Sequence, residues 1–376
     1  MGQRFAPAMA WAEIDLKAVA HNFVAIKKAA GPKLKILCVV KADAYGHGNI
    51  PIAKLLEKKG ADLFGIADIH EGIALRKAGI KKPILMVENT LPEHATYLVK
   101  NRITPIVCTL ELAREMNRLG AQERRKVAVH IKIDTGMGRL GVAPQEALSF
   151  TKALKGLPWI SVEGICTHFP LSDTDSAFTR RQIKNFLDIV NEIRKTFSLD
   201  IPFVHAANSM GIAAYSKKDF TMVRAGLILY GMYPSAKIRN KMSLKPAMSV
   251  KSRITFLKDV NKGQGISYGH RFIAPRPMKV ATIGIGYNDG YFRIFSNKAQ
   301  VLIRGERCPV LGTVTMDQIM VDASRVPGVK IGDEVCVLGS QGKESVSANE
   351  LAKLAATINY EITCALGNRM TRIYVH

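Results

Sequence analysis

The segment VVKADAYGHG places Lys41 directly after the apolar run Ile36–Val40. A lysine whose stem packs at the end of a strand has a poorly solvated amine. Burial favours the neutral amine, which is a nucleophile toward aldehydes. Tyr45 and two glycines follow in the same loop. The alternative is an ordinary lysine that extends from a strand end into solvent, and this segment alone does not decide between the two.

The segment HIKIDTGMGRLG carries polar side chains at alternate positions, His130, Lys132 and Asp134. In a strand these three side chains share one face, and that face must meet a solvated or functional interior. The glycines that follow allow the backbone to approach a ligand. Arg139 offers a planar fork to a carboxylate or a phenolate. A glycine-rich loop with a surface arginine is the alternative.

Three further segments could complete one site. THF contains His168, for which a structural role is as plausible as a functional one. HAANS and VRAGLILYG contain Ser209 and Arg224. The Ser209 hydroxyl and the amides of Gly226 and Leu227 could together hold a phosphate. Each signal is weak alone, and the prediction depends on their convergence on one site.

The last third of the chain adds ISYGH with Tyr268, GYNDG with Tyr287, and MDQ with Met316 and Asp317. Each of these segments could be an ordinary hairpin turn.

Eight short apolar runs between residues 30 and 235 alternate with segments whose apolar residues have helical spacing. This alternation predicts a (β/α)8 TIM-like barrel, in which the residues that follow the strands converge on one face. A doubly wound open sheet gives the same alternation, but the count of eight favours the barrel. The runs are Ile36–Val40, Phe64–Ala67, Ile84–Val87, Ile106–Cys108, Val127–Ile133, Ser161–Cys166, Phe203–Ala206 and Thr221–Val223.

After about residue 240, β-branched runs punctuated by glycine predict a small, mainly β domain. The predicted domains are 1–243 and 244–376, with Lys245-Pro246 as a linker. A capping box at Ser347–Glu350 predicts a helix over Leu351–Thr357. The predicted strands are Val250–Phe256, Val280–Ile285, Gln300–Ile303, Val310–Thr315, Ile319–Val321 and Glu334–Leu338.

The composition, with 47% hydrophobic and 23% charged residues, excludes a largely disordered chain. The 54 Lys and Arg against 31 Asp and Glu leave a net charge of +23. The basic residues occur in short groups without a run of five, which favours a solvated basic surface over a nucleic-acid site.

The sequence contains no transmembrane segment of 18 apolar residues. Glu13 and Asp15 interrupt a signal-peptide pattern, and Ala6 lacks the hydroxyl that myristoylation of Gly2 requires. Six single cysteines without a CxxC motif predict reduced, mostly buried thiols and a cytoplasmic protein without a metal.

Taken in order, these motifs resemble those of alanine racemases, from Ala12 to about Tyr374. The resemblance implies a fold-type III barrel with a C-terminal β domain, and pyridoxal 5′-phosphate as a Schiff base on Lys41. It places Arg224 at the pyridine nitrogen, with His205 behind it, and Arg139 at the cofactor phenolate and substrate carboxylate. Tyr45, Ser209, the Gly226 and Leu227 amides and Tyr360 match the phosphate ligands, and His168 lies near the ring.

The resemblance also implies a homodimer with shared active sites, because Tyr268, Tyr287, Met316 and Asp317 would reach the site from the second subunit. Met316 and Asp317 would then contact the substrate. Lys132 matches a position that is carbamylated in many members. Thr313 is a departure, since members often have arginine there, in the channel that gives access to the site.

The implied reaction interconverts L- and D-alanine and supplies D-alanine for peptidoglycan. Two bases act on opposite faces of Cα, Lys41 on the D-isomer and Tyr268 on the L-isomer. Arginine stays protonated, so it would leave the pyridine nitrogen unprotonated and disfavour transamination or decarboxylation.

Three rival interpretations remain open at this point. The first is a broader-specificity racemase or a decarboxylase on the same fold. The second is a pyridoxal phosphate carrier without turnover, and the third is a nucleic-acid binder suggested only by the net charge. The favoured partners are alanine and a second copy of the chain, with no nucleic acid and no membrane.

Overall fold

The computed structural model describes residues 8–376, which form two compact units. One unit, the barrel, contains Val19–Ala44 and Asn49–Lys245. The other, the β unit, contains the N-terminal strand, the segment Tyr45–Gly48 and Pro246–His376. The predictions for Gly2 and Ala6 concern residues outside the described range.

Eight parallel strands form the sheet of the barrel, in the order β8-β7-β6-β5-β4-β3-β2-β9. The sheet closes on itself, since Thr221 N donates to Val204 O (3.0 Å) and Arg224 N donates to Ala207 O (2.9 Å) across β8 and β9. This architecture confirms the predicted (β/α)8 barrel. The strands are β2 (Lys35–Val39), β3 (Leu63–Ile66), β4 (Ile84–Met86), β5 (Ile103–Val107), β6 (Val127–Lys132), β7 (Ile160–Cys166), β8 (Phe203–His205) and β9 (Met222–Ala225).

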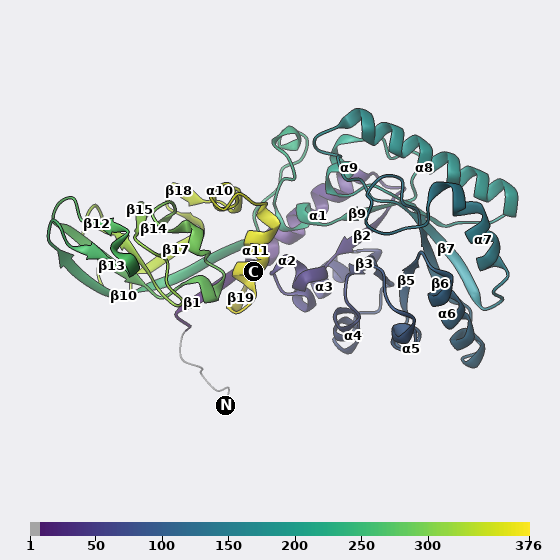
Figure 1. Cartoon of the computed structure of the whole chain (residues 1–376), viewed down its shortest axis with the longest axis horizontal. Helices are drawn as coiled ribbons and strands as arrows, with labels where there is room; N and C mark the ends of the chain where they lie inside the picture. The colour runs from purple at the N-terminus through teal and green to yellow at the C-terminus, as the bar shows by residue number, and fades with distance from the viewer. Residues whose placement is uncertain (1–7) are drawn as a thin grey trace. The chain divides into compact units, whose positions relative to one another are not determined.

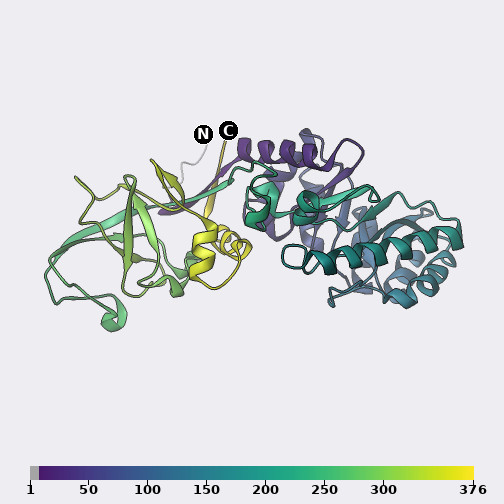
Figure 2. The same cartoon turned by 90° about the horizontal axis from the view of Figure 1, so that it is seen from above.

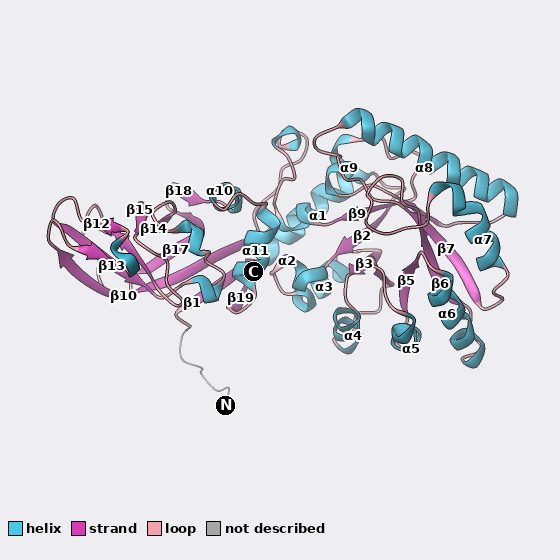
Figure 3. Ribbon diagram, viewed as in Figure 1, coloured by secondary structure: helices cyan, strands magenta, loops and turns pink. Residues whose placement is uncertain are grey.

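Helices lie on the outside of these strands (Figure 1; Figure 3). In the helix at Leu110–Gln122, Leu112, Met116 and Leu119 are buried at the spacing of one helical face. The helices are α1 (Leu16–Ala30), α2 (Lys41–Tyr45), α3 (Asn49–Lys58), α4 (Ile69–Lys77), α5 (Ala95–Lys100), α6 (Leu110–Gln122), α7 (Ala147–Lys155), α8 (Ser176–Phe197) and α9 (Ser209–Ala214).

The β unit contains a nine-stranded sheet in the order β18-β17-β14-β15-β16-β13-β10-β1-β19. Its longest strand, β10, pairs with β1, β13 and β17. The strands are β1 (Ala10–Asp15), β10 (Met248–Val260), β13 (Met278–Ile283), β14 (Gln300–Ile303), β15 (Glu306–Leu311), β16 (Ile319–Asp322), β17 (Glu334–Gln341), β18 (Glu344–Val346) and β19 (Thr371–Val375), with a separate hairpin of β11 (Gly265–Ile266) and β12 (Phe272–Ile273). Two helices, α10 (Ala348–Leu354) and α11 (Asn359–Gly367), lie side by side (Figure 2).

Several predicted elements of the β unit differ from the structure. The predicted strand at 310–315 ends at Leu311, because Gly312 takes φ +71° and turns the chain. Helix α10 begins and ends three residues earlier than predicted. The Ser347 hydroxyl accepts from Glu350 N as expected (3.1 Å), but the Glu350 carboxylate pairs with Arg307 (2.8 Å).

The N-terminal strand β1 was counted with the barrel in the predicted division at 243/244. In the structure it pairs antiparallel with β10 and parallel with β19, so it belongs to the sheet of the β unit.

All six cysteines are free thiols, and four of them are buried. Among residues 8–376, no helix has the length and apolar character needed to cross a membrane.

Candidate active site

The chain turns sharply at the carboxyl end of β2, directly after Lys41. Ala42, Asp43, Ala44 and Tyr45 all have φ between 50° and 56°, so α2 is a left-handed helical turn. This conformation costs roughly 1–2 kcal/mol per residue for side chains other than glycine. Two hydrogen bonds help to hold it, from Ala44 N to Val40 O (2.9 Å) and from Asn49 N to the Asp43 carboxylate (2.7 Å). The turn leaves Lys41 at the mouth of the barrel.

An acidic residue joins the two basic side chains that the sequence predicted for this mouth. Lys41 Nζ donates to Glu88 Oε1 at 2.7 Å, and Glu88 Oε2 lies 3.7 Å from Arg139 Nη2. Both basic side chains remain partly exposed, so a ligand can reach them. The sequence analysis missed Glu88, although it lies immediately after the run Ile84–Val87 and so at the end of a predicted strand.

The glycine-rich loop after β6 is organised by Asp134. Its carboxylate accepts hydrogen bonds from the backbone N–H groups of Gly136, Met137 and Gly138 at 2.8–3.1 Å. Burial opposes the ionised form, but these N–H groups hold the pKa of Asp134 below its usual value. Asp134 therefore shapes the loop that carries Arg139.

Lys132 lies at the end of β6, with only 5% of its surface exposed. Burial lowers the pKa of its amine to about 8, and the nearby Arg224 and Arg139 cations act in the same direction. A substantial fraction of this lysine is therefore neutral near physiological pH, unlike an ordinary surface lysine.

Arg224 is buried and makes five hydrogen bonds. Nη1 donates to His205 Nδ1 (2.9 Å) and His205 O (3.0 Å). Nη2 donates to Thr167 O (2.8 Å), His168 Nδ1 (3.1 Å) and Ala206 O (3.1 Å). A guanidinium donates and never accepts, so both Nδ1 atoms are unprotonated and both rings carry their proton on Nε2.

The hydrogen-bond chain continues from His205 to His130, whose Nδ1 lies 2.9 Å from His205 Nε2. Burial, and then the charge of Arg224, lowers the pKa of His130 to about 3, and the same two causes hold the pKa values of His168 and His205 well below their usual range. These three imidazoles are therefore neutral around Arg224. Gly164 of β7 is part of this arrangement, because a Cβ there would overlap the His130 ring.

The residues predicted to hold a phosphate form two groups, one in the barrel and one in the β unit. Ser209 Oγ accepts from Gly226 N at 3.2 Å, and Leu227 follows at the start of a short 3-10 helix. In the β unit, the rings of Tyr45 and Tyr360 pack against each other with their centroids 5.8 Å apart.

The remaining predicted site residues gather in the β unit. Tyr268 is 72% exposed and Met316 is 53% exposed. The Asp317 carboxylate lies 3.5 Å from Arg369 Nη1. Thr313, which the resemblance places in an access channel, is only 2% exposed; its hydroxyl donates to Tyr268 O at 2.9 Å.

Comparison with known proteins assigns the family. Residues 14–234 match the model for the alanine racemase N-terminal domain, and residues 247–374 match that for the C-terminal domain. The chain belongs to the alanine racemase family. An alanine racemase of Halothermothrix orenii is 44% identical over 365 residues, which cover 97% of this chain and 96% of the relative.

Solved structures of the family agree with this assignment. The alanine racemase of Clostridium difficile 630 is 39% identical, with a TM-score of 0.93, over 99% of this chain and 97% of that one. The alanine racemase of Bartonella henselae, solved with covalently bound pyridoxal phosphate, is 28% identical with a TM-score of 0.88, over 98% of this chain and all of that one.

The barrel of this family member offers the donors that pyridoxal phosphate requires. Lys41 would supply the amine, and the Ser209 hydroxyl and the Gly226 amide, which lie together, would hold the phosphate. Both terminal nitrogens of Arg224 are occupied, and its Nε–H has no hydrogen-bond partner among residues 8–376. The donor set fits the cofactor. Within the same residues, no cluster of three His, Cys, Asp or Glu could hold a metal ion.

Proposed function

We propose that this alanine racemase interconverts L- and D-alanine with pyridoxal phosphate attached to Lys41. The observation that carries the proposal is the fixed, buried Arg224. Its five hydrogen bonds and its neutral histidine neighbours leave only Nε–H for a ligand. A group that presents a hydrogen-bond acceptor to this position, an aldehyde to Lys41 and a phosphate to Ser209 matches pyridoxal phosphate.

The cofactor, when bound, supplies an electron sink that makes the Cα proton of an attached amino acid acidic. Arg224 limits that sink. As a donor that retains its own proton, it would hold the pyridine nitrogen as an acceptor and not protonate it. This favours return of the proton to Cα over transamination or decarboxylation.

Two residues of the chain would move the Cα proton. Lys41 would act on one face of Cα, held in position by Glu88. Tyr268 would act on the opposite face, and we propose that it comes from a second copy of the chain in a homodimer with shared active sites. Support comes from the exposure of Tyr268 and of Met316 in the single chain, which a partner would cover.

Arg139 would bind the substrate carboxylate and the cofactor phenolate, and the partner's Met316 and Asp317 would contact the substrate. We also propose that Tyr45, Tyr360 and the Leu227 amide join Ser209 and Gly226 at the phosphate, with His168 beside the ring. Carbamylation of Lys132 would place an anion beside Arg139 and is supported by the lowered pKa of this amine, which leaves part of it neutral and nucleophilic.

We also propose that the boundary between the barrel and the β domain lies at 243/244, as in the division 1–243 and 244–376, except that strand β1 joins the sheet of the β domain. The six free thiols support a cytoplasmic location.

Chiral analysis of L-alanine and of L-serine, each incubated with the purified protein and pyridoxal phosphate, tests the function. Formation of D-alanine that Lys41→Ala abolishes is the expected result. Equal rates on serine would favour a broader-specificity racemase. Absence of any D-product, with the cofactor visibly bound, would contradict racemisation.

Exchange of the Cα hydrogen with solvent deuterium tests the assignment of the two bases. Tyr268→Phe should still exchange the Cα hydrogen of D-alanine through Lys41, and should lose exchange with L-alanine. Equal exchange of both isomers by this variant would contradict the assignment.

A further inference from the structure

The loops that lead into the barrel strands carry much of the positive charge of the chain. Each of these eight loops, taken with one residue on either side, joins the end of a helix to the start of a strand. Together they hold 15 Lys and Arg against 4 Asp and Glu, a surplus of 11 out of the total of 23. The segments are 30–35, 58–63, 77–84, 100–103, 122–127, 155–160, 197–203 and 214–222.

The opposite end of the barrel has the reverse charge. The loops that leave the strands, counted in the same way to the next α-helix (for β9, to the 3-10 helix at Leu227), hold 3 Lys and Arg against 7 Asp and Glu. In a parallel barrel all loops of one kind lie at the same end. The charge of the barrel is therefore separated along its axis, and the basic end lies away from Lys41 and Arg224.

Most of the basic side chains at this end are not neutralised. Fourteen of the fifteen are exposed, Lys217 being the exception. Of these fifteen side chains, only Lys35 forms an ion pair with another described residue, with Asp62 at 3.1 Å. The Glu57 carboxylate, on the adjoining helix, accepts from the backbone N–H groups of Lys81 and Lys82 and leaves their ammonium groups in solvent.

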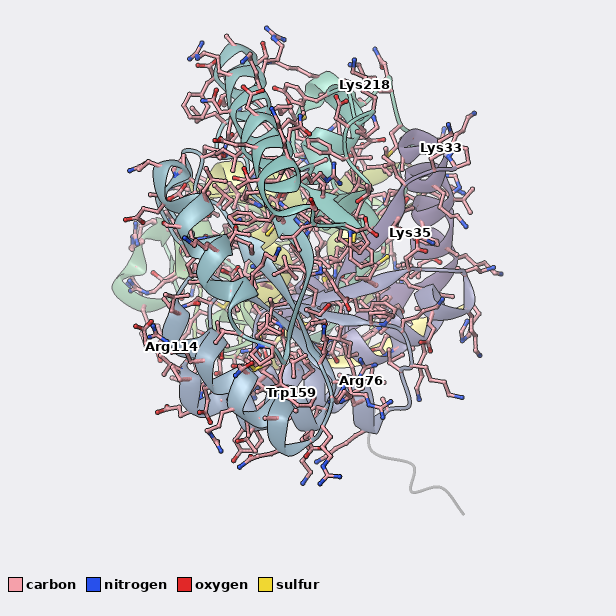
Figure 4. All side chains as sticks on the ribbon, turned by 90° about the vertical axis from the view of Figure 1, so that its right-hand side faces the viewer. Lys33, Lys35, Arg76, Arg114, Trp159 and Lys218 are labelled. Atoms are coloured by element: carbon pink, nitrogen blue, oxygen red, sulfur yellow. The ribbon has the colours of Figure 1, made fainter. Side chains whose placement is uncertain are left out.

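The chemistry of this end matches a flat anionic surface. Twelve of the fifteen basic residues are lysine, a flexible point charge without the fork that arginine offers to bases and phosphates. None of the large apolar side chains exposed among the described residues falls in these segments, so nothing is available to insert into a hydrocarbon layer. Trp159 is half-buried (Figure 4).

The distribution of charge distinguishes a membrane from a nucleic acid. Basic groups lie in seven of the eight loops around the barrel. We call the basic residues of these loops the basic ring. Because the helices that surround the barrel are about 10–12 Å wide, the basic ring spans on the order of 40 Å. Duplex recognition places one helix or ribbon in a groove about 12 Å wide, which would engage only part of this ring. Lys33, Lys35 and Lys218 of the ring are labelled on the face that Figure 4 shows.

We propose that this end of the barrel docks reversibly on bilayers that contain anionic phospholipids. Lysine clusters bind such bilayers through headgroup charge alone, and salt weakens that attraction. From the sequence we expected no membrane partner, and the short groups of basic residues favoured a solvated basic surface; the fold collects these groups at one end of the barrel. The inference does not depend on the racemase reaction.

Co-sedimentation of the full chain with vesicles tests the proposal. The vesicles are phosphatidylcholine alone or phosphatidylcholine with phosphatidylglycerol, at about 0.1 M and about 1 M salt. The ring variant carries Lys33→Glu, Lys59→Glu, Lys82→Glu and Lys126→Glu, four exposed residues without an ion pair among the described residues. The matched control makes the same change of net charge in the β unit, with Lys258→Glu, Lys330→Glu, Lys343→Glu and Lys353→Glu.

The expected result is binding to anionic vesicles only, lost at the higher salt concentration. The ring variant should lose at least tenfold in affinity, whereas the control loses less than threefold, and both should keep the racemisation rate of the wild type. Failure to bind anionic vesicles at the lower salt concentration would overturn the proposal, as would equal losses in the two variants. Binding of duplex DNA at protein concentrations too low for vesicle binding would replace the membrane with a nucleic acid.

Discussion

Glu88 is a residue whose contacts assign it a role that the sequence pattern did not. It lies 2.7 Å from Lys41 Nζ and 3.7 Å from Arg139 Nη2, and so holds both cations at the barrel mouth. Glu88→Gln keeps the shape and removes the charge. Because hydrogen bonds to charged groups contribute about 1.5–3 kcal/mol, and these groups are partly exposed, we expect kcat/KM for alanine to fall by about tenfold.

Steady-state kinetics of both directions measures this effect. Glu93→Gln is the matched control, since its carboxylate follows in the same loop and is largely exposed. A Glu88→Gln variant with unchanged kcat/KM would show that the bridge is dispensable.

The lowered pKa of Lys132 predicts that the stability of the protein depends on pH. Its pKa is about 8 in the folded chain and near 10.5 when unfolded. Between these values the unfolded state binds more protons, so the free energy of unfolding rises with pH, by about 3 kcal/mol at most. Below pH 8 the protein bears the full cost of a buried ammonium group. Urea unfolding of wild type and Lys132→Met in buffer free of carbon dioxide should show that the variant lacks this rise; equal pH slopes would contradict the prediction.

At the scale of elements, the left-handed turn α2 stores conformational strain next to Lys41. Ala42 is exposed and has φ 51°, a conformation that glycine adopts without a Cβ penalty. Ala42→Gly should therefore raise the free energy of unfolding by about 1 kcal/mol. Ala25→Gly, in the right-handed helix α1, is the control and should lower it by about 1 kcal/mol. Chemical denaturation measures the free energy of unfolding of both variants. A decrease of similar size in both would contradict a left-handed turn at Ala42.

The loop that carries Tyr268 is held by a reciprocal pair of hydrogen bonds. Ser267 Oγ donates to Thr313 O (2.6 Å), and Thr313 Oγ1 donates to Tyr268 O (2.9 Å). Thr313→Val keeps the volume but leaves a carbonyl without its donor, so we expect kcat to fall about fivefold or more with little change in KM. Thr313→Ser restores the hydroxyl and should recover most of the rate. Similar kinetics of the valine and serine variants would exclude this role.

The two sheets differ in how closely their strands can be predicted from the sequence. The eight barrel strands were located to within a few residues because most of them are short, mainly apolar runs that are largely buried. Strand β1 was missed because its partner β10 lies more than 230 residues further along the chain. The left-handed turn had no local signal at all, since Ala, Asp and Tyr disfavour positive φ and only the surrounding contacts select it.

The candidate site also combines residues that a local sequence pattern indicates with contacts that only the fold shows. Lys41, Arg139, Ser209 and Arg224 could be chosen as candidates from the sequence because each follows an apolar run or lies in a glycine-rich loop. The Arg224–His205–His130 chain needed the fold, because its members come from three strands.

At the scale of the whole molecule, sequence distance hides what the fold brings together. The residues of the basic ring occur one to three in each of seven loops, separated by whole helices and strands. Only closure of the barrel places them at one end and the acidic residues at the other. The surplus of basic residues can be counted from the sequence, but the topology of the barrel determines where those residues lie.

Shared active sites predict that two inactive variants can complement each other. In a mixed dimer of Lys41→Ala and Tyr268→Phe chains, one site receives both substitutions and the other receives the intact Lys41 and the intact Tyr268. Random exchange of subunits makes about half of the dimers mixed, so about a quarter of wild-type activity should return. Each variant alone, passed through the same dissociation and reassociation, is the control. If each site drew both bases from one chain, every site in the mixture would lack a base and no activity would return.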